Sequence, residues 1–239
     1  MKKNLLSLCS VLMILAAAVS FSSCNSNKNE PTWPDLTMQD IVTLTGANDK
    51  GFSVVFRKEN DSPLVTLTFA GDGQRIDTTK VKVGQRFLLA YVPASGQPYV
   101  SGSATAWGYS PIPNVKLTFG SRDGNQSWMS EQINVLQLWR TGSWINLNCT
   151  VPMKQTYKKL ALVVDDSTKD SSVPTAYLLY LSDNSVEATE QQLIATFDVS
   201  EIWNNEKYKG LNVVVANGAG SHRFSFEKDN GQVTIKPNE

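Results

Sequence analysis

The strongest constraint on the fold is a two-residue alternation of apolar and polar side chains within short segments. Residues 145–151 alternate strictly, with Ile145, Leu147 and Cys149 on one face and polar residues on the other. Residues 114–119 repeat the pattern. Because successive side chains of a β-strand point to opposite faces, this spacing predicts strands that bury one face.

Similar runs recur along the chain, rich in Val, Thr, Tyr, Phe and Trp and separated by Gly, Asn, Asp and Pro. They predict strands at residues 41–46, 52–58, 64–69, 86–92, 114–119, 132–140, 145–151, 160–164, 176–181, 192–197, 211–216, 222–227 and 232–236. No helical periodicity is sustained over three turns beyond the apolar N-terminal run, and one short helix at most is expected, near residues 186–191. The sequence therefore predicts an all-β protein.

A polar, turn-forming segment over residues 120–130 is long for a loop inside one compact domain. It predicts a boundary between a small β-barrel over residues 36–120 and an antiparallel β-sandwich over residues 130–239. Domains of roughly one hundred residues are common for both architectures. A single larger sandwich is the alternative.

The first two dozen residues predict export and lipidation. Lys2 and Lys3 precede an apolar run over residues 5–19, which is shorter than the ~20 residues that a membrane-spanning helix needs. Small residues then stand directly before Cys24. This order resembles the lipobox of bacterial lipoproteins, and the resemblance implies removal of the signal peptide, residues 1–23, and acylation of Cys24.

The same resemblance implies that acyl chains on Cys24 anchor the protein in a membrane. Asn25 stands where inner-membrane lipoproteins often carry aspartate, so we expect the outer membrane. Residues 24–35 are the lipidated polar spacer, and Glu30 is the single acid of the stretch 26–30, where some surface lipoproteins carry acidic runs. Both the periplasmic face and the cell surface are compatible with this spacer.

Charge and cysteine content narrow the chemistry further. The chain has 22 Lys and Arg against 22 Asp and Glu, and its sequence contains no cluster of basic residues. We therefore do not expect it to bind nucleic acid. The lipobox resemblance implies that Cys9 is removed with the signal peptide and that Cys24 is acylated, so no intramolecular disulfide is expected. Cys149 lies on the apolar face of its segment and is expected to be a buried, unreactive thiol.

The sequence offers little for catalysis. His222 is the only histidine, and the adjacent Ser221 should point to the opposite face of their strand. One histidine and one buried cysteine cannot form a tetrahedral zinc site. The acidic turn at residues 165–170 lacks the spacing of a calcium loop. We therefore predict no catalytic residue, no metal site and no cofactor, and a protein that is not an enzyme.

Aromatic residues remain as candidates for partner contact, because they stack on sugar rings and are enriched at protein interfaces. Tyr99, Trp107 and Tyr109 lie in a Gly-, Ser- and Pro-rich segment, residues 93–113, which we interpret as a long loop. Trp144 falls on the polar side of its predicted strand. Two further tryptophans follow apolar strands and are expected in the core: Trp139 and Trp203.

Three segments resemble the NigD-like lipoproteins of Gram-negative gut anaerobes. Residues 83–91 resemble a barrel strand of that family, and residues 133–139 with 143–147 resemble the hairpin that opens its sandwich. The resemblance implies a lipobox, a polar spacer, an OB-like barrel and a β-sandwich. Asp72-Gly73 and Trp33-Pro34 depart from the family's order of turn motifs, so the strand order in the barrel is less firmly predicted.

These observations predict a cell-envelope lipoprotein that binds an unknown protein or glycan partner and has no nucleic-acid partner. The family name comes from a bacteriocin gene cluster, so the resemblance implies an immunity-like role and supplies no catalytic residues. The alternative is a carbohydrate-binding accessory lipoprotein of a polysaccharide uptake system. A hydrolase that uses carboxylates is a third alternative.

Overall fold

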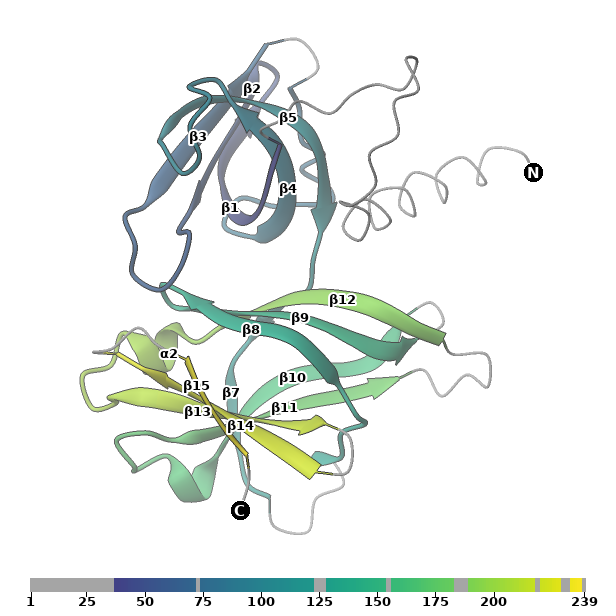
Figure 1. The fold of residues 1–239 in the computed structure, drawn as a ribbon, viewed down its shortest axis with the longest axis vertical. Helices are drawn as coiled ribbons and strands as arrows, with labels where there is room; N and C mark the ends of the chain where they lie inside the picture. The colour runs from purple at the N-terminus through teal and green to yellow at the C-terminus, as the bar shows by residue number, and fades with distance from the viewer. Residues whose placement is uncertain are drawn as a thin grey trace. The chain divides into compact units, whose positions relative to one another are not determined.

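The computed structural model describes residues 37–71, 74–122, 128–153, 156–182, 189–217, 220–228 and 233–237. The predicted signal peptide, Cys24 and the spacer lie outside these residues, as do Asp72 and Gly73. Within the described residues the fold is nearly all β: a closed barrel is followed in the chain by two sheets packed face to face (Figure 1). The prediction of an all-β chain, with a small barrel before a sandwich, is confirmed.

The barrel is built from β1 (Met38–Asn48), β2 (Gly51–Phe56), β3 (Val65–Ala70), β4 (Arg86–Pro93) and β5 (Gly102–Pro111). It closes in the order β1-β2-β3-β5-β4, with β1 antiparallel to β4 and β3 parallel to β5. Alternate residues point inward, and stacked Phe52 and Phe69, 4.4 Å between ring centroids, lie in this core.

The segment 93–113, interpreted from the sequence as a long loop, contains β5 instead. Its inward-facing positions, Ala104 and Ala106, are small residues that give no strong apolar alternation. The register also shifts opposite Ala90 and Tyr91, which makes Trp107 the extra residue of a β-bulge. A bulge breaks the two-residue period, so the pattern that revealed the other strands could not reveal this one.

The sandwich strands are β6 (Asn114–Lys116), β7 (Thr118–Gly120), β8 (Asn134–Thr141), β9 (Trp144–Met153), β10 (Tyr157–Asp165), β11 (Thr175–Ser182), β12 (Thr189–Asp198), β13 (Gly210–Asn217), β14 (Gly220–Glu227) and β15 (Val233–Pro237). One sheet has the order β15-β14-β13-β11-β10-β7 and the other β6-β12-β9-β8. Most neighbours are antiparallel, but β7 and β10, β6 and β12, and β11 and β13 pair in parallel.

The predicted end of the barrel domain at residue 120 does not match this pairing. Strands β6 and β7 pair with β12 and β10, so the chain leaves the barrel after β5 and enters both sheets of the sandwich at once. The alternation over residues 114–119 correctly indicated strands with a buried face. The buried face belongs to the sandwich core, where Leu117 is 2% exposed. Local alternation shows that a strand buries one face, but it does not show which of two cores that face joins.

Two smaller elements complete the described fold. A short 3₁₀-helix, η2 (Asp166–Thr168), follows β10, and α2 (Ser200–Trp203) follows β12. The helix expected near residues 186–191 is not where α2 lies: residues 189–191 belong to β12, and residues 183–188 are outside the described part. Among the described residues, no helix has the length and apolar character to cross a membrane.

Cys149 lies in the core between the two sheets, fully shielded from solvent. Burial raises the pKa of its thiol to about 12, so the reactive thiolate is rare at neutral pH. The prediction of a buried, unreactive cysteine is confirmed.

Candidate functional site

The barrel contacts the sandwich where the β2–β3 loop, residues 57–64, meets the β8–β9 hairpin. Residues 35–239 form one compact unit, and main-chain hydrogen bonds cross this contact. Asn60 N donates to Arg140 O at 2.8 Å, and Gly142 N donates to Asn60 O at 2.7 Å. The loop thus adds an isolated β-bridge to the hairpin. We call this contact region the junction.

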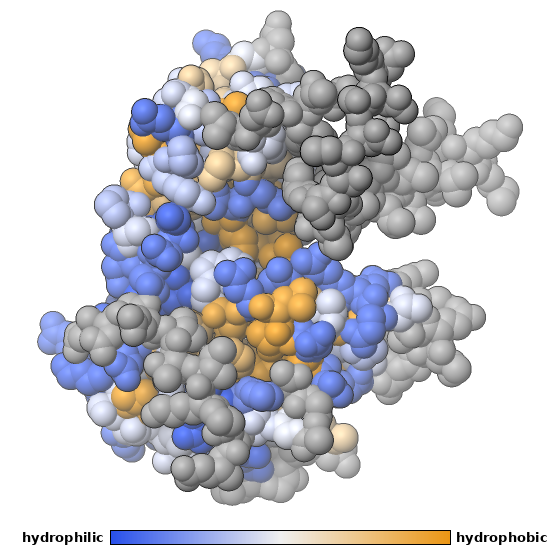
Figure 2. Space-filling model, viewed as in Figure 1, coloured by the Kyte–Doolittle hydropathy of each residue, from blue (hydrophilic) through white to orange (hydrophobic). Residues whose placement is uncertain are grey.

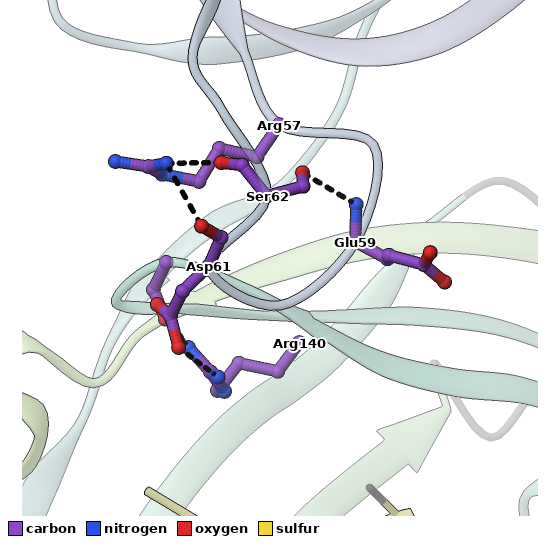
Figure 3. A network of polar contacts seen from close by, with 6 residues as sticks. Arg57, Glu59, Asp61, Ser62 and Arg140 are labelled. Atoms are coloured by element: carbon purple, nitrogen blue, oxygen red, sulfur yellow. Dashed lines mark hydrogen bonds and ion pairs between the residues drawn. The ribbon is translucent and has the colours of Figure 1, made fainter. Parts of the chain in front are cut away.

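A bidentate ion pair reinforces the junction (Figure 3). Arg140 Nη1 and Nη2 donate to the two carboxylate oxygens of Asp61 at 2.9 and 2.6 Å, and Nη1 also donates to Gly142 O. The hydrogen bond from Arg140 is the main reason why the pKa of Asp61 is lowered. The Arg140 side chain is 1% exposed, whereas that of Asp61 is 60% exposed. The guanidinium also covers the ring of Trp203 at 4.2 Å.

Arg86 is the second buried arginine of the junction, at the first residue of β4. Its Nη1 donates to Asn146 Oδ1 at 2.7 Å and Thr196 Oγ1 at 3.0 Å, both on the sandwich. Its Nη2 donates to Ile41 O on the barrel at 3.1 Å and to Thr141 Oγ1 at 3.2 Å. One side chain therefore joins both parts of the fold.

Every hydrogen-bond acceptor of Arg86 is a neutral oxygen, and no described carboxylate pairs with it. Its Nε is buried without a hydrogen-bond partner. Burial, to 3% exposure, lowers the pKa of Arg86 to about 9, which leaves the group charged at neutral pH. A buried cation without a counter-ion is costly for a fold.

The junction contains a cavity of about 470 Å³, within the usual size range of small-molecule sites. Figure 2 shows hydrophobic residues at the surface where the barrel meets the sandwich. The charged and aromatic residues that line the cavity are Arg57, Asp61, Arg86, Phe56, Trp144 and Trp203. A second cavity of about 200 Å³ shares Arg57 and Arg86 with the first and adds Asp40 and Lys58.

Of the four aromatic residues predicted to contact a partner, Trp144 is the one that lines the junction cavity. The guanidinium of Arg86 lies over its ring at 5.3 Å, so one face of Trp144 is covered. Trp107 is 48% exposed at the bulge of β5. Trp107 and Trp144 thus belong to different surfaces, and their contact with a partner stays a prediction.

The two tyrosines of the predicted set make structural contacts in the barrel. Tyr109 Oη accepts a hydrogen bond from Asp77 N at 2.9 Å, and its ring meets Phe87 edge-on at 6.1 Å. Tyr99 meets Phe56 edge-on, and its pKa is raised mainly by burial. Lys58 Nζ lies 4.9 Å from the centroid of the Tyr99 ring. Neither tyrosine lines the junction cavity.

Sequence reasoning missed the arginines of the junction. The available signal was Arg86 itself, a charged residue on the same face of β4 as Leu88 and Ala90. Trp203, expected in the core, is partly buried: it packs against the sandwich core and also lines the cavity. Trp139 is partly buried as well and lines the second cavity.

The acidic turn after β10 uses its carboxylates in local contacts. Asp165 accepts hydrogen bonds from Ser167 N at 2.9 Å and Ser167 Oγ at 2.7 Å, which caps η2. Asp170 forms an ion pair with Lys207 at 2.8 Å. In the described part of the chain, no group of three or more His, Cys, Asp or Glu residues could hold a metal ion.

No protein-family model and no curated protein matches the chain, but solved structures do. A protein of unknown function from Bacteroides vulgatus matches with a TM-score of 0.62 at 16% identity, over 80% of this chain and 90% of its own. A Bacteroides fragilis protein described as a lipoprotein matches with a TM-score of 0.54 at 11% identity, over 84% of this chain and 95% of its own.

A NigD-like immunity protein from Bacteroides caccae also matches, with a TM-score of 0.54 at 10% identity, over 86% of this chain and 94% of its own. Identities this low establish a shared fold and nothing finer. The resemblance to NigD-like lipoproteins, first indicated by residues 83–91 and the sandwich hairpin, is confirmed at the level of the fold.

Proposed function

We propose that this protein is a lipid-anchored, non-enzymatic binding protein of the outer membrane and that the junction cavity is its recognition site. The observation that carries the proposal is the lining of that cavity. It combines two arginines with the rings of Trp144 and Trp203, and the described lining contains no histidine or cysteine beside a nucleophile. Such a set of side chains favours binding of a partner over cleavage of a bond.

The anchoring part of the proposal rests on Cys24 and on the fold shared with a protein described as a lipoprotein. Acyl chains on Cys24 would hold the protein at the bilayer, and the polar spacer would give it reach. Confinement to a membrane raises the effective concentration of a partner there, so moderate contacts suffice.

The proposed partner is a protein, and the proposed role is immunity-like: binding an antibacterial protein at the envelope. The NigD-like immunity protein with the same fold supports this choice. The alternative, a carbohydrate-binding accessory lipoprotein of an uptake system, is favoured by one observation. Trp107 is 48% exposed on the barrel, and an exposed indole is a common platform for a sugar ring.

Mass spectrometry of the mature N-terminus tests the anchor. We expect Cys24 as the first residue, carrying acyl chains, in the outer-membrane fraction. An unmodified N-terminus at another residue would show that the lipobox resemblance is accidental, and the anchoring proposal would be withdrawn.

The recognition site is tested with two matched substitutions, Trp144→Ala and Trp107→Ala. Cross-linking in intact cells, followed by mass spectrometry, should show a protein partner whose yield falls about tenfold in Trp144→Ala and is unchanged in Trp107→Ala. A glycan array on the same proteins tests the alternative, which predicts glycan retention that only Trp107→Ala abolishes. Equal yields and equal retention for all three proteins would contradict both roles.

A further inference from the structure

The junction carries more positive than negative charge. Three arginines meet there, Arg57, Arg86 and Arg140, whereas Asp61 is the one carboxylate that lines the larger cavity. Both oxygens of Asp61 accept hydrogen bonds from Arg140, so this carboxylate is already paired. Arg57 and Arg86 form no ion pair with a carboxylate among the described residues, although the charge of Arg57 contributes to the lowered pKa of Asp61.

The second cavity has the same imbalance. Lys58 joins Arg57 and Arg86 there, and Asp40 is the one carboxylate on its wall. Asp40 accepts a hydrogen bond from Tyr91 Oη at 2.9 Å, and burial raises its pKa. Three cationic side chains therefore line this wall beside one carboxylate.

Arg86 supplies a fixed charge that solvent cannot screen well. The neutral oxygens around it orient their dipoles toward the guanidinium, but they do not cancel its charge. In a buried setting the effective dielectric constant is low, so the field of this cation extends into the adjoining cavity. A negative group placed there would recover part of the energy that its burial costs.

Arg57 supplies the hydrogen-bond donors. Its Nη1 donates to the carbonyl oxygens of Ser62 and Asp61, which fixes the side chain against the loop. Its Nε and Nη2 have no acceptor among the described residues, and in Figure 3 the second terminal nitrogen points away from both carbonyls. A guanidinium edge with two unused donors matches the paired oxygens of a carboxylate or a phosphate.

We propose that the junction cavity recognises its partner through an oxyanion group, a carboxylate or a phosphate. Arg57 is the direct donor, and Arg86 is the buried charge that favours an anion at this place. Trp144 and Trp203 form the walls for the rest of the ligand. This proposal depends on the binding function proposed above and adds the chemical class of the group that the cavity recognises.

Titration calorimetry with three matched probes tests the proposal on the mature full chain in neutral detergent at pH 7 and low salt. The probes are glucuronate, glucose 6-phosphate and glucose, which share a ring and differ in charge. We expect at least one anion to bind about tenfold or more tightly than glucose, with an affinity that falls as salt is added. The better anion shows whether carboxylate or phosphate is the natural group.

Arg57→Gln isolates the donor, because Arg57 is partly exposed and its loss should leave the buried network intact. We expect this variant to bind the preferred anion about tenfold more weakly and glucose unchanged. Arg223→Gln is the matched control: it removes one positive charge from an exposed position on β14, outside the cavity, and should bind like the wild type.

Three results would overturn the proposal. Glucose could bind as tightly as both anions, both anions could fail to bind, or Arg57→Gln could bind them like the wild type. None of these results concerns the acylated N-terminus or the protein cross-link. These results would therefore reject the oxyanion proposal without rejecting the proposed binding function.

Discussion

Replacing Arg86 with alanine is expected to lower the free energy of unfolding by about 4 kcal/mol. The substitution removes the hydrogen bonds that Arg86 donates to Ile41 O, Asn146 Oδ1 and Thr196 Oγ1, and of these side chains Asn146 keeps a donor in Thr196 Oγ1. It also opens a void where the barrel meets the sandwich. Unpaired buried acceptors and a new void each destabilise a fold, so their sum should be among the largest effects of any polar substitution in this chain.

Chemical denaturation of the full chain measures this loss. Arg75→Ala is the control, because Arg75 is an exposed barrel arginine outside both junction cavities, and its replacement should cost less than about 0.5 kcal/mol. Arg86→Met separates two causes, since it fills the volume but donates no hydrogen bond, and it should fall between wild type and Arg86→Ala. Equal stability of Arg86→Ala and Arg75→Ala would show that the buried network does not hold the junction together.

The ion pair of Arg140 and Asp61 should respond asymmetrically to the removal of its two members. Arg140→Ala is expected to cost about 3 kcal/mol, because it empties a fully buried site and uncovers the ring of Trp203. Asp61→Ala should cost only about 1 kcal/mol. The Asp61 side chain is 60% exposed, so solvent screens its charge and water can reach Arg140 once the carboxylate is gone.

Denaturation of both single variants and of the double variant gives the coupling energy of the pair. We expect about 1 kcal/mol of coupling, weaker at high salt because the carboxylate is exposed. Asp77→Ala is the matched control: Asp77 pairs with Lys80 on the barrel surface, and its loss should have a smaller effect. Costs that are equal for Arg140→Ala and Asp61→Ala would refute the asymmetry.

Most strands could be predicted from the sequence because each has a buried face and a regular alternation. Residues 145–151 are the clearest example, with Ile145, Leu147 and Cys149 all in the sandwich core. β5 was missed because its inward residues are small and a bulge at Trp107 interrupts the period. Alternation is thus a sufficient sign of a strand with one buried face, and its absence does not exclude a strand.

The candidate site was much less predictable. Trp144 was among the predicted contact residues because it falls on the polar side of its strand, and it lines the cavity. Its neighbours in the cavity, Arg57 and Arg86, come from another part of the chain, and Arg86 bonds to Thr196, 110 residues away. Local periodicity contains no information about contacts of that range. The one local sign was a charged residue at the start of an apolar strand, which is also a common sign of a solvated strand end.

The route of the chain out of the barrel limits how the protein can be divided for experiments. Strand β6 pairs with β12, and β7 pairs with β10. A recombinant fragment that begins at residue 130 would lack β6 and β7 and would therefore expose the backbone edges of β12 and β10. Free strand edges pair with other copies, so such a fragment should aggregate. Asn114 Nδ2 donates to Arg86 O, and Asn114 Oδ1 accepts from Arg86 N, so even a cut just before β6 would sever a reciprocal link. Work on isolated halves would therefore describe damaged proteins, and binding partners should be sought with the intact chain.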